Sequence, residues 1–492
     1  MSIPGIPGLG QIAPVDAPSQ AAAAASAAGA SQIQDLQPFW EYRFEVPHGS
    51  ELTIKLVSGT AEKDGTELAP GNAYSFTATK SKINTWHGCS LEVACPKGSF
   101  DAYTAEPSAA DQTPSVSHVN LHFKLEGLRS AAASRHARGN TDAMGPRVLV
   151  VGPPNSGKTS LVRTLTGWAT RMDRQPLVVS TDPSEGMLAL PGTLSAAVFA
   201  TLMDITTEWG STPTSGPSPI PVKLPLSYYY GLEHPEDNAK LYKRVCSSLS
   251  VSATARLTED PEVRAAGMLI DTTGIANPGA AKDGSAYDAL AHIVAEFSIN
   301  IIVVLGSERM TSDLQKRFGS HRTTLDEEVT VVGLDKSGGV VERDATFMQQ
   351  VREAAIREYF FGDARNTLSP FTQQVDFAAL SLWRINEGSL NDDNDNGGQQ
   401  HHHTTMTPAS DDTVQRVEPS LMMQNCTLAV MYASVHDPPD TIRDANVMGF
   451  VYVADVDEKR KKLKILAPVS ARLGDRPLLW GSWPEPMVSL LG

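Results

Sequence analysis

Four residues in the middle of the chain have the types and spacing of a phosphate-binding loop. Gly152, Gly157, Lys158 and Thr159 form the pattern G-x-x-x-x-G-K-T. Glycine lets backbone N–H groups approach phosphate oxygens closely, the lysine ammonium pairs with the β- and γ-phosphates, and the threonine hydroxyl is the expected Mg²⁺ ligand. The pattern therefore predicts binding of a nucleoside triphosphate together with Mg²⁺.

The segments on either side of this loop have the character that a phosphate site needs. Residues 147–151 (RVLVV) predict a buried parallel strand, and Leu161, Val162, Leu165 and Trp168 fall on one face of the helix that follows. The N-terminus of that helix would add its partial positive charge. The alternative is a glycine-rich turn that only caps a helix, and the flanking strand and helix favour the phosphate loop.

Two aspartates end predicted strands of the same region. Asp182 follows the apolar segment 177–181, and Asp271 ends the segment 267–271. Ligands of parallel sheets lie at the carboxyl ends of the strands, so either carboxylate could reach a bound Mg²⁺. The alternative for each residue alone is a loop-starting or helix-capping aspartate.

Phosphoryl transfer also needs positive charge that closes over the transferred group, and arginine suits this task because its planar fork binds phosphate bidentately. The segment VREAAIREYFFG supplies Arg352 and Arg357 as candidates on one mobile helix or lid. The alternative is a solvated amphipathic helix in which Glu353 and Glu358 are their partners.

Composition limits the class of protein. The chain has 492 residues, 41% of them hydrophobic, and a formal net charge of −15. Such a length normally forms about three domains. The negative charge argues against broad attachment to nucleic acid, so contact with RNA is expected to be local or indirect. No apolar stretch approaches the roughly 20 residues of a membrane span, and no secretory signal is recognisable. The four cysteines suit a reducing compartment. Together these features predict an intracellular protein.

The N-terminal part of the chain changes character twice. Residues 1–32 are rich in Ala, Pro, Ser and Gly and predict a disordered leader. Period-two alternation then predicts an all-β domain over 33–125, whose last strand is expected at 119–125. A linker or helix is expected over 126–143.

The central and C-terminal parts alternate differently. Apolar segments at 177–181, 267–271, 299–305 and 330–334 are separated by helical stretches, which predicts a wound parallel sheet within a domain spanning 144–380. A further domain is expected over 381–492, because short strands return at 427–432, 447–456 and 463–467. A polar tract at about 391–412 contains His401, His402 and His403, and it predicts a disordered insertion rather than a metal site.

Several segments together resemble one family, the P-loop polynucleotide 5′-hydroxyl kinases that include the ATP-binding subunit of the pre-mRNA 3′-end cleavage and polyadenylation factor. The matching segments, in chain order, are TAEKDGTEL, TWHG, GPPNSGKTSL, DPSE with LPGTLS, DKSGGVVER, IREYFFG and MGFVYVADVDEKRKKLKIL. The resemblance implies an α/β fold, in which a central P-loop NTPase sheet with helices is flanked by an N-terminal β-sandwich and a small C-terminal mixed α/β domain.

The resemblance also implies roles for particular residues. Glu41 and Lys80 align with adenine-side contacts in the sandwich, and Asp182 aligns with the acid that orients the metal or accepts the proton of the attacking 5′-hydroxyl. Arg352 and Arg357 align with lid arginines over the γ-phosphate. The ATP phosphates and Mg²⁺ would be held by Asn155, Ser156, Gly157, Lys158, Thr159 and Ser160, with Thr159 on the metal.

Two departures from the family pattern bear on catalysis. Active members resemble D-x-G-Q after the second strand, whereas this chain has Asp182-Pro183-Ser184-Glu185, whose carboxylate would repel an incoming RNA phosphate. Active members also have a Trp that suits stacking on a base, whereas this chain has Ile275, which cannot supply the roughly 1 to 3 kcal/mol per base of aromatic stacking. Phosphate binding is therefore expected to persist while binding of a 5′-end is weakened.

The function that the resemblance implies is an ATP-binding scaffold subunit of cleavage factor IA in the nucleus, required for endonucleolytic cleavage before polyadenylation and lacking kinase turnover. Its implied partners are the scaffold subunit that contacts RNA polymerase II and other 3′-end processing subunits. The alternative is an active kinase that transfers the ATP γ-phosphate to RNA or DNA 5′-ends. A GTPase switch or generic ATPase is a third class, and the chain has no N-K-x-D segment after the P-loop to read guanine.

Overall fold

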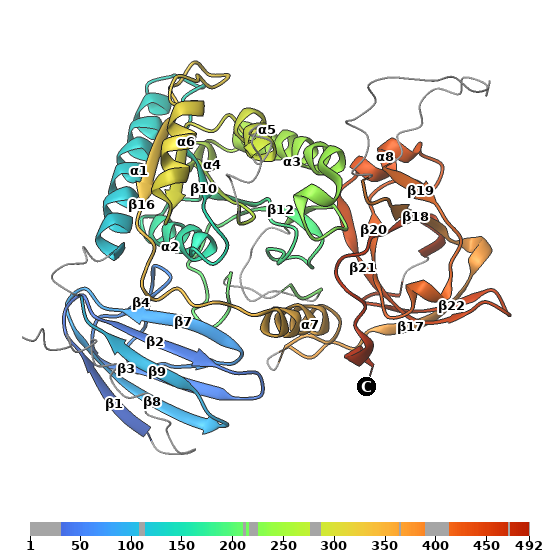
Figure 1. The fold of residues 1–492 in the computed structure, drawn as a ribbon, viewed down its shortest axis with the longest axis horizontal. Helices are drawn as coiled ribbons and strands as arrows, with labels where there is room; N and C mark the ends of the chain where they lie inside the picture. The colour runs from blue at the N-terminus through green and yellow to red at the C-terminus, as the bar shows by residue number, and fades with distance from the viewer. Residues whose placement is uncertain are drawn as a thin grey trace, which may run out of the picture.

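The computed structural model describes residues 31–107, 114–209, 213–215, 225–275, 287–363, 366–388, 413–470 and 473–491. Figure 1 shows an N-terminal pair of β-sheets, a central sheet covered by helices, and a C-terminal domain built on a third layer of strands. This is the predicted fold class. The predicted leader and the predicted insertion at 391–412 lie outside the described residues, except that the first strand begins at Ser31.

The N-terminal domain is a sandwich of two antiparallel sheets, ordered β1-β8-β3-β6 and β5-β4-β7-β2-β9. Leu52, Ile54 and Leu56 alternate with outward-facing residues along β3 and are at most 1% exposed, as the period-two pattern predicted. The strands are β1 (Ser31–Leu36), β2 (Glu41–Val46), β3 (Glu51–Gly59), β4 (Glu62–Lys63), β5 (Thr66–Glu67), β6 (Ala73–Phe76), β7 (Thr79–Asn84), β8 (Cys89–Lys97) and β9 (Asp101–Ala105).

The strand predicted at 119–125 is wrong, because these residues lie within helix α1 (Pro114–Ala137). Val119, Leu121, Phe123 and Leu125 alternate as a strand would, but Phe123 is 64% exposed while Leu121 and Leu125 are buried. The latter two are four residues apart, so they share one helix face and pack with α2 against the central sheet. Tertiary packing therefore selects the helical period from an ambiguous pattern.

The central domain contains a seven-stranded sheet ordered β13-β12-β11-β14-β10-β15-β16. The five predicted parallel strands are present, and the P-loop strand β10 lies among them. Two strands that were not predicted, β12 and β13, extend one edge of the sheet and pair antiparallel. Parallel pairing needs a crossover helix, whereas a loop connects β11 to β12. The strands are β10 (Arg147–Val151), β11 (Leu177–Ser180), β12 (Thr193–Val198), β13 (Leu226–Tyr229), β14 (Met268–Asp271), β15 (Ile301–Leu305) and β16 (Thr330–Leu334).

Helices cover both faces of this sheet (Figure 1). Val148 and Val150 of β10 pack with residues of α1 and α2, whereas Leu149 and Val151 face α3, α5 and α6. A strand buried on both faces in this way explains the uninterrupted apolar run in its sequence. The helices are α2 (Lys158–Arg171), α3 (Ala239–Glu259), α4 (Pro261–Ala266), α5 (Asp288–Glu296), α6 (Glu308–Phe318) and α7 (Ala345–Phe361).

The C-terminal domain is a mixed seven-stranded sheet ordered β17-β22-β21-β20-β23-β18-β19, with a short helix α8 (Pro439–Asp444). The three strands predicted for this region are confirmed as β20, β21 and β22. The strands are β17 (Phe371–Asp376), β18 (Ser381–Ile385), β19 (Val414–Arg416), β20 (Thr427–Met431), β21 (Val447–Asp457), β22 (Lys462–Ala467) and β23 (Pro477–Trp480). Among the described residues, no helix is long and apolar enough to span a membrane.

A buried carboxylate joins the N-terminal sandwich to the P-loop helix α2. Glu62 of β4 is 2% exposed, and its Oε1 accepts hydrogen bonds from Trp86 Nε1 at 3.1 Å and from Trp168 Nε1 at 3.0 Å. Its Oε2 accepts from Arg171 Nη1 at 2.7 Å. Trp168 and Arg171 belong to α2. This one side chain therefore fixes the sandwich against the helix that carries predicted phosphate-binding residues.

The substitution Glu62→Ala should lower the free energy of unfolding by about 3 kcal/mol, because it leaves the buried Trp168 indole N–H, the half-buried Trp86 indole N–H and the partly exposed Arg171 guanidinium without their acceptor. Chemical denaturation followed by tryptophan fluorescence measures this loss. The matched control is Glu67→Ala, which removes another carboxylate that pairs with Arg171 but is 58% exposed, and it should cost less than about 1 kcal/mol. Equal losses in the two variants would contradict the role assigned to Glu62.

Candidate nucleotide-binding site

The loop between β10 and α2 adopts a backbone that few sequences can form. Asn155 and Gly157 have φ values of 51° and 89°, in the left-handed region. A Cβ atom added to Gly152 would lie 2.7 Å from both the Leu305 carbonyl oxygen and Ser156 Oγ, so no larger residue fits there. Successive N–H groups in such a turn converge on one point and form an anion-binding concavity.

Two buried hydroxyls at the P-loop pocket have no hydrogen-bond partner among the described residues. Ser156 is 2% exposed, and its hydroxyl has no hydrogen-bond partner within the described part of the chain. The same holds for the buried Thr273 hydroxyl, which lines the same pocket. Lys158 is 8% exposed and donates to the Pro153 carbonyl at 3.1 Å. Buried polar groups normally have partners, so the two unpartnered hydroxyls fit a site built for a polar ligand.

Thr159 and Asp271 form the best pair of oxygen donors for a divalent cation. Thr159 Oγ1 donates to Asp271 Oδ2 at 2.6 Å, and Asp271 is 3% exposed at the end of β14. Burial raises the pKa of Asp271 to about 7, against the opposing effects of the Thr159 hydrogen bond and Lys158. A buried carboxylate that is costly to ionise, beside a hydroxyl, fits a hard cation that takes oxygen ligands.

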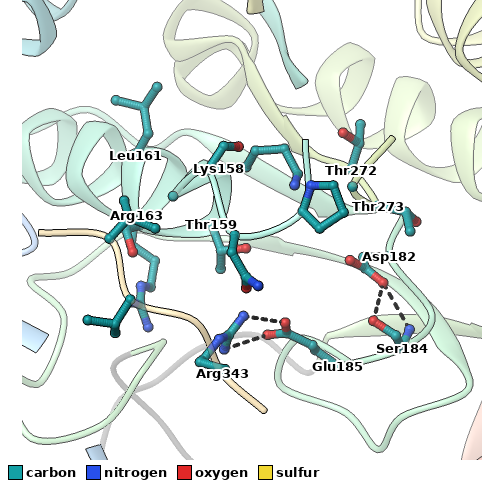
Figure 2. Close-up of a pocket in the computed structure, with 18 of the residues that line it drawn as sticks. Lys158, Thr159, Leu161, Arg163, Asp182, Ser184, Glu185, Thr272, Thr273 and Arg343 are labelled. Atoms are coloured by element: carbon teal, nitrogen blue, oxygen red, sulfur yellow. Dashed lines mark hydrogen bonds and ion pairs between the residues drawn. The ribbon is translucent and has the colours of Figure 1, made fainter. Parts of the chain in front are cut away.

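Asp182 lines the same pocket but is engaged differently. Its Oδ1 accepts hydrogen bonds from the Ser184 backbone N–H at 2.9 Å and from Ser184 Oγ at 2.6 Å (Figure 2). The structure thus brings Asp271, rather than Asp182, into contact with Thr159. Asp182 remains within electrostatic reach of Lys158, whose pKa is lowered by burial and raised by Asp271 and Asp182.

The loop opens into a cavity of about 1060 Å³ that extends from the central domain to the sandwich. Near the sandwich, its wall includes Arg43, Lys80, Lys82, Tyr103 and Phe347. The lining residues from the central domain include His234, Ile275 and Ala289. A cavity of this size and mixed polarity can hold a nucleotide-sized ligand.

The two predicted sandwich residues lie at different depths. Lys80 lines the cavity, pairs with Glu45 at 3.0 Å, and lies 5.2 Å from the centre of the Phe347 ring. Glu41 is not among the lining residues; it accepts hydrogen bonds from Lys82 and from Arg43 Nε, the latter at 2.9 Å. Burial alone would raise the pKa of Glu41, but Lys82 and Arg43 together lower it. Glu41 therefore positions two cations of the cavity wall instead of facing a ligand.

The predicted lid arginines do not line the cavity. Arg352 stacks on the Trp483 ring, 4.4 Å from its centre, and its Nε lies 3.0 Å from Glu485 Oε2. Arg357 Nη2 donates to the Ser489 carbonyl at 2.6 Å. Both arginines of α7 thus hold the C-terminal segment of the chain, and the structure does not bring them to the P-loop. The face of α7 that they occupy is decided by contacts with residues more than a hundred positions away.

The cation that does reach the P-loop pocket, from the segment before α7, is Arg343, which the sequence analysis did not single out. Its guanidinium forms a bidentate ion pair with Glu185, at 3.2 Å and 2.5 Å (Figure 2). Arg343 belongs to the quoted segment DKSGGVVER, which was the available signal. The Glu185 carboxylate, expected to repel phosphate, is therefore balanced by a guanidinium.

Comparison with known proteins covers the whole chain. Family models described as the N-terminal beta-sandwich domain of polyadenylation factor, the mRNA cleavage and polyadenylation factor CLP1 P-loop, and the pre-mRNA cleavage complex II protein Clp1 match residues 35–132, 152–362 and 368–485. The chain is 53% identical to the mRNA cleavage and polyadenylation factor clp1 of Botryotinia fuckeliana, with all of both chains covered. It is 47% identical to CLP1 of Pyricularia oryzae, with 99% of this chain and 100% of that one covered. This chain belongs to the Clp1 family of mRNA cleavage and polyadenylation factors.

Solved structures agree with this assignment. A structure of wild-type Clp1p in complex with Pcf11p superposes with a TM-score of 0.76 at 26% identity, covering 92% of this chain and 98% of that one. A second, described by the extended interface between Pcf11p and Clp1p and by the structural basis for ATP loss in a point mutant, has the same TM-score at 27% identity and the same coverage. The predicted family resemblance is thereby confirmed.

Replacing Arg352 with alanine should weaken the attachment of the C-terminal segment by about 1 to 3 kcal/mol, because it removes an ion pair and a cation–π contact that are only partly exposed. Limited proteolysis and thermal unfolding measure this effect. Arg309→Ala is the control, because Arg309 is 74% exposed and lies 4.0 Å from Asp313. A variant of Arg352 as stable as the Arg309 control would count against the attachment.

Glu358 of α7 should make stability depend on pH. Burial raises its pKa to about 7, with a smaller contribution from Asp363. The unfolded chain therefore loses this proton near pH 4.5, before the folded protein does, and the folded state loses stability as the pH rises from about 4.5 to 7. The free energy of unfolding of Glu358→Gln, taken relative to that of wild type, should be about 1 to 3 kcal/mol higher at pH 8 than at pH 4. An equal difference between the two proteins at both pH values in urea unfolding would refute this.

Proposed function

We propose that this chain is an ATP- and Mg²⁺-binding scaffold subunit of the nuclear machinery for pre-mRNA 3′-end cleavage and polyadenylation, without kinase turnover. The observation that carries the proposal is the P-loop itself, with left-handed Asn155 and Gly157 and the unpartnered hydroxyl of Ser156 beside the paired Thr159 and Asp271. A member of the Clp1 family with this loop has the means to hold a triphosphate.

Different residues of this chain would bind different parts of the nucleotide. Backbone N–H groups of residues 155–160 would surround the phosphates, and Lys158 would pair with their oxygens. Thr159 and Asp271 would hold Mg²⁺, which supplies positive charge to the phosphate oxygens. The wall at Arg43, Lys80 and Tyr103 would face the base end.

The surroundings of the loop favour retention of a bound nucleotide over transfer of its γ-phosphoryl group. A kinase needs unengaged cations over the γ-phosphate and a grip on the second substrate. In this chain Arg352 and Arg357 bind the C-terminal segment, Arg343 is paired with Glu185, and the aliphatic Ile275 lines the pocket. A bound nucleotide would then contribute stability to the central domain instead of a phosphoryl group.

The partner chemistry follows from the relatives. The solved Clp1p structures contain Pcf11p, and we propose that this chain likewise binds a Pcf11-like subunit of the cleavage factor. Contact of that subunit with RNA polymerase II, and indirect rather than direct contact of this chain with RNA, belong to the same proposal. The net charge of −15 supports the second point.

Protein purified without added nucleotide should release ATP and Mg²⁺ on denaturation, measured by chromatography and metal analysis. Adding ATP and Mg²⁺ to protein freed of nucleotide should raise its free energy of unfolding by about 4 kcal/mol at a thousandfold excess over Kd. Lys158→Ala should lose both effects, because the buried ammonium is the main cation within the loop. Lys55→Ala, a lysine on the sandwich surface, is the charge-matched control.

The same preparations separate the proposal from its alternative. With labelled ATP and a 5′-hydroxyl oligonucleotide, phosphate transfer should not exceed that of Lys158→Ala. Transfer above this background would establish an active kinase and overturn the scaffold proposal. Protein that contains no nucleotide and unfolds identically with and without ATP and Mg²⁺ would overturn the binding proposal itself.

A further inference from the structure

The Glu185–Arg343 ion pair joins two loops that come from opposite sides of the P-loop. Glu185 follows β11, and Arg343 lies between β16 and α7. The sheet order places β11 and β16 on either side of β10, the strand that leads into the P-loop. The pair therefore connects both halves of the sheet across the edge where phosphate would bind, and it lines the same pocket as Thr159 and Asp182 (Figure 2).

Charges on this pair act on the phosphate-binding lysine. Glu185 raises and Arg343 lowers the pKa of Lys158, after the larger effects of burial and of two aspartates. Each side chain of the pair is less than one third exposed, so water screens them only in part. Both groups lie within electrostatic reach of any phosphate held by Lys158.

The other cations of this part of the pocket have different partners. Arg163 lies 3.6 Å from both Asp64 and Glu208. Lys158 belongs to the loop. Among the described residues, the carboxylate in contact with Arg343 is Glu185, which itself lines the pocket, while the charges of Glu208 and Asp182, after the larger and opposite effect of burial, raise the pKa of Arg343 without direct contact.

A guanidinium binds a carboxylate and a phosphate through the same two-pronged geometry. A triphosphate in the loop would place several negative charges near Glu185, so carboxylate and phosphate cannot both have the full use of one guanidinium. We infer that Glu185 is an internal competitor for Arg343 and that this ion pair lowers the affinity of the pocket for nucleoside triphosphates. The inference rests on the proposed function, because it concerns the same phosphate site.

The test measures the Kd of MgATP by calorimetry on full-length protein freed of nucleotide. Glu185→Gln keeps the shape of the side chain and removes its charge, and it should tighten binding about tenfold. Glu208→Gln is the matched control: it removes a carboxylate that also lines the pocket but pairs with Arg163, and it should change Kd less than about threefold. Circular dichroism and thermal unfolding verify that each variant is folded.

A double-mutant cycle decides whether competition is the cause. In an Arg343→Gln background, Glu185→Gln should no longer tighten binding; if Arg343→Gln does not fold, Arg343→Lys should at least halve the gain. A Glu185→Gln variant that binds MgATP no better than wild type overturns the inference and leaves the nucleotide site intact. If Glu185→Gln tightens MgATP binding just as much in the Arg343→Gln background, the inference is also overturned. Repulsion between the Glu185 carboxylate and the phosphates would then explain the effect without any competition for Arg343. Absence of binding in every variant overturns the proposed function, and this inference with it.

Discussion

The backbone turn between β10 and α2 is the constraint on which the rest of this structure depends. Positive φ values at Asn155 and Gly157 point successive N–H groups into one space, and Gly152 has no room for a Cβ atom. A turn of this kind persists only where the surrounding structure holds it. Parallel strands on both sides of β10 and the buried face of α2 supply that support.

The N-terminal sandwich belongs to the same support. Glu62 ties it to the C-terminal turn of α2, and Arg43, Lys80 and Lys82 then form one wall of the cavity that begins at the P-loop. The sandwich is therefore more than an attached module, because its position relative to α2 decides which groups face a ligand. Glu41 acts behind this wall by holding two of its cations.

Charge pairing within the cavity has a geometric more than an energetic role. Burying an ion pair costs about as much as the attraction returns, so such pairs contribute little net stability. They do fix where each charged group lies. Glu185 with Arg343 and Asp64 with Arg163 surround Lys158 with charges of both signs, whereas Arg352 with Glu485 fastens α7 to the C-terminal segment. The helix α7 thus connects the cavity to the third domain.

The sequence by itself determined the P-loop and the five parallel strands, because each of these depends on neighbours within a few positions along the chain, and it determined the family through several such local segments in the right order. It failed at 119–125, where alternation matched both a strand and a helix. It also did not predict that Arg352 and Arg357 contact the C-terminal segment, and it left Asp182 and Asp271 open as metal ligands. Those outcomes depend on which surfaces meet in space. Only the tertiary structure brings α7 against residues 483–489, Thr159 against Asp271, and Arg343 against Glu185. Contacts of that kind join segments more than a hundred residues apart, and no local spacing encodes them.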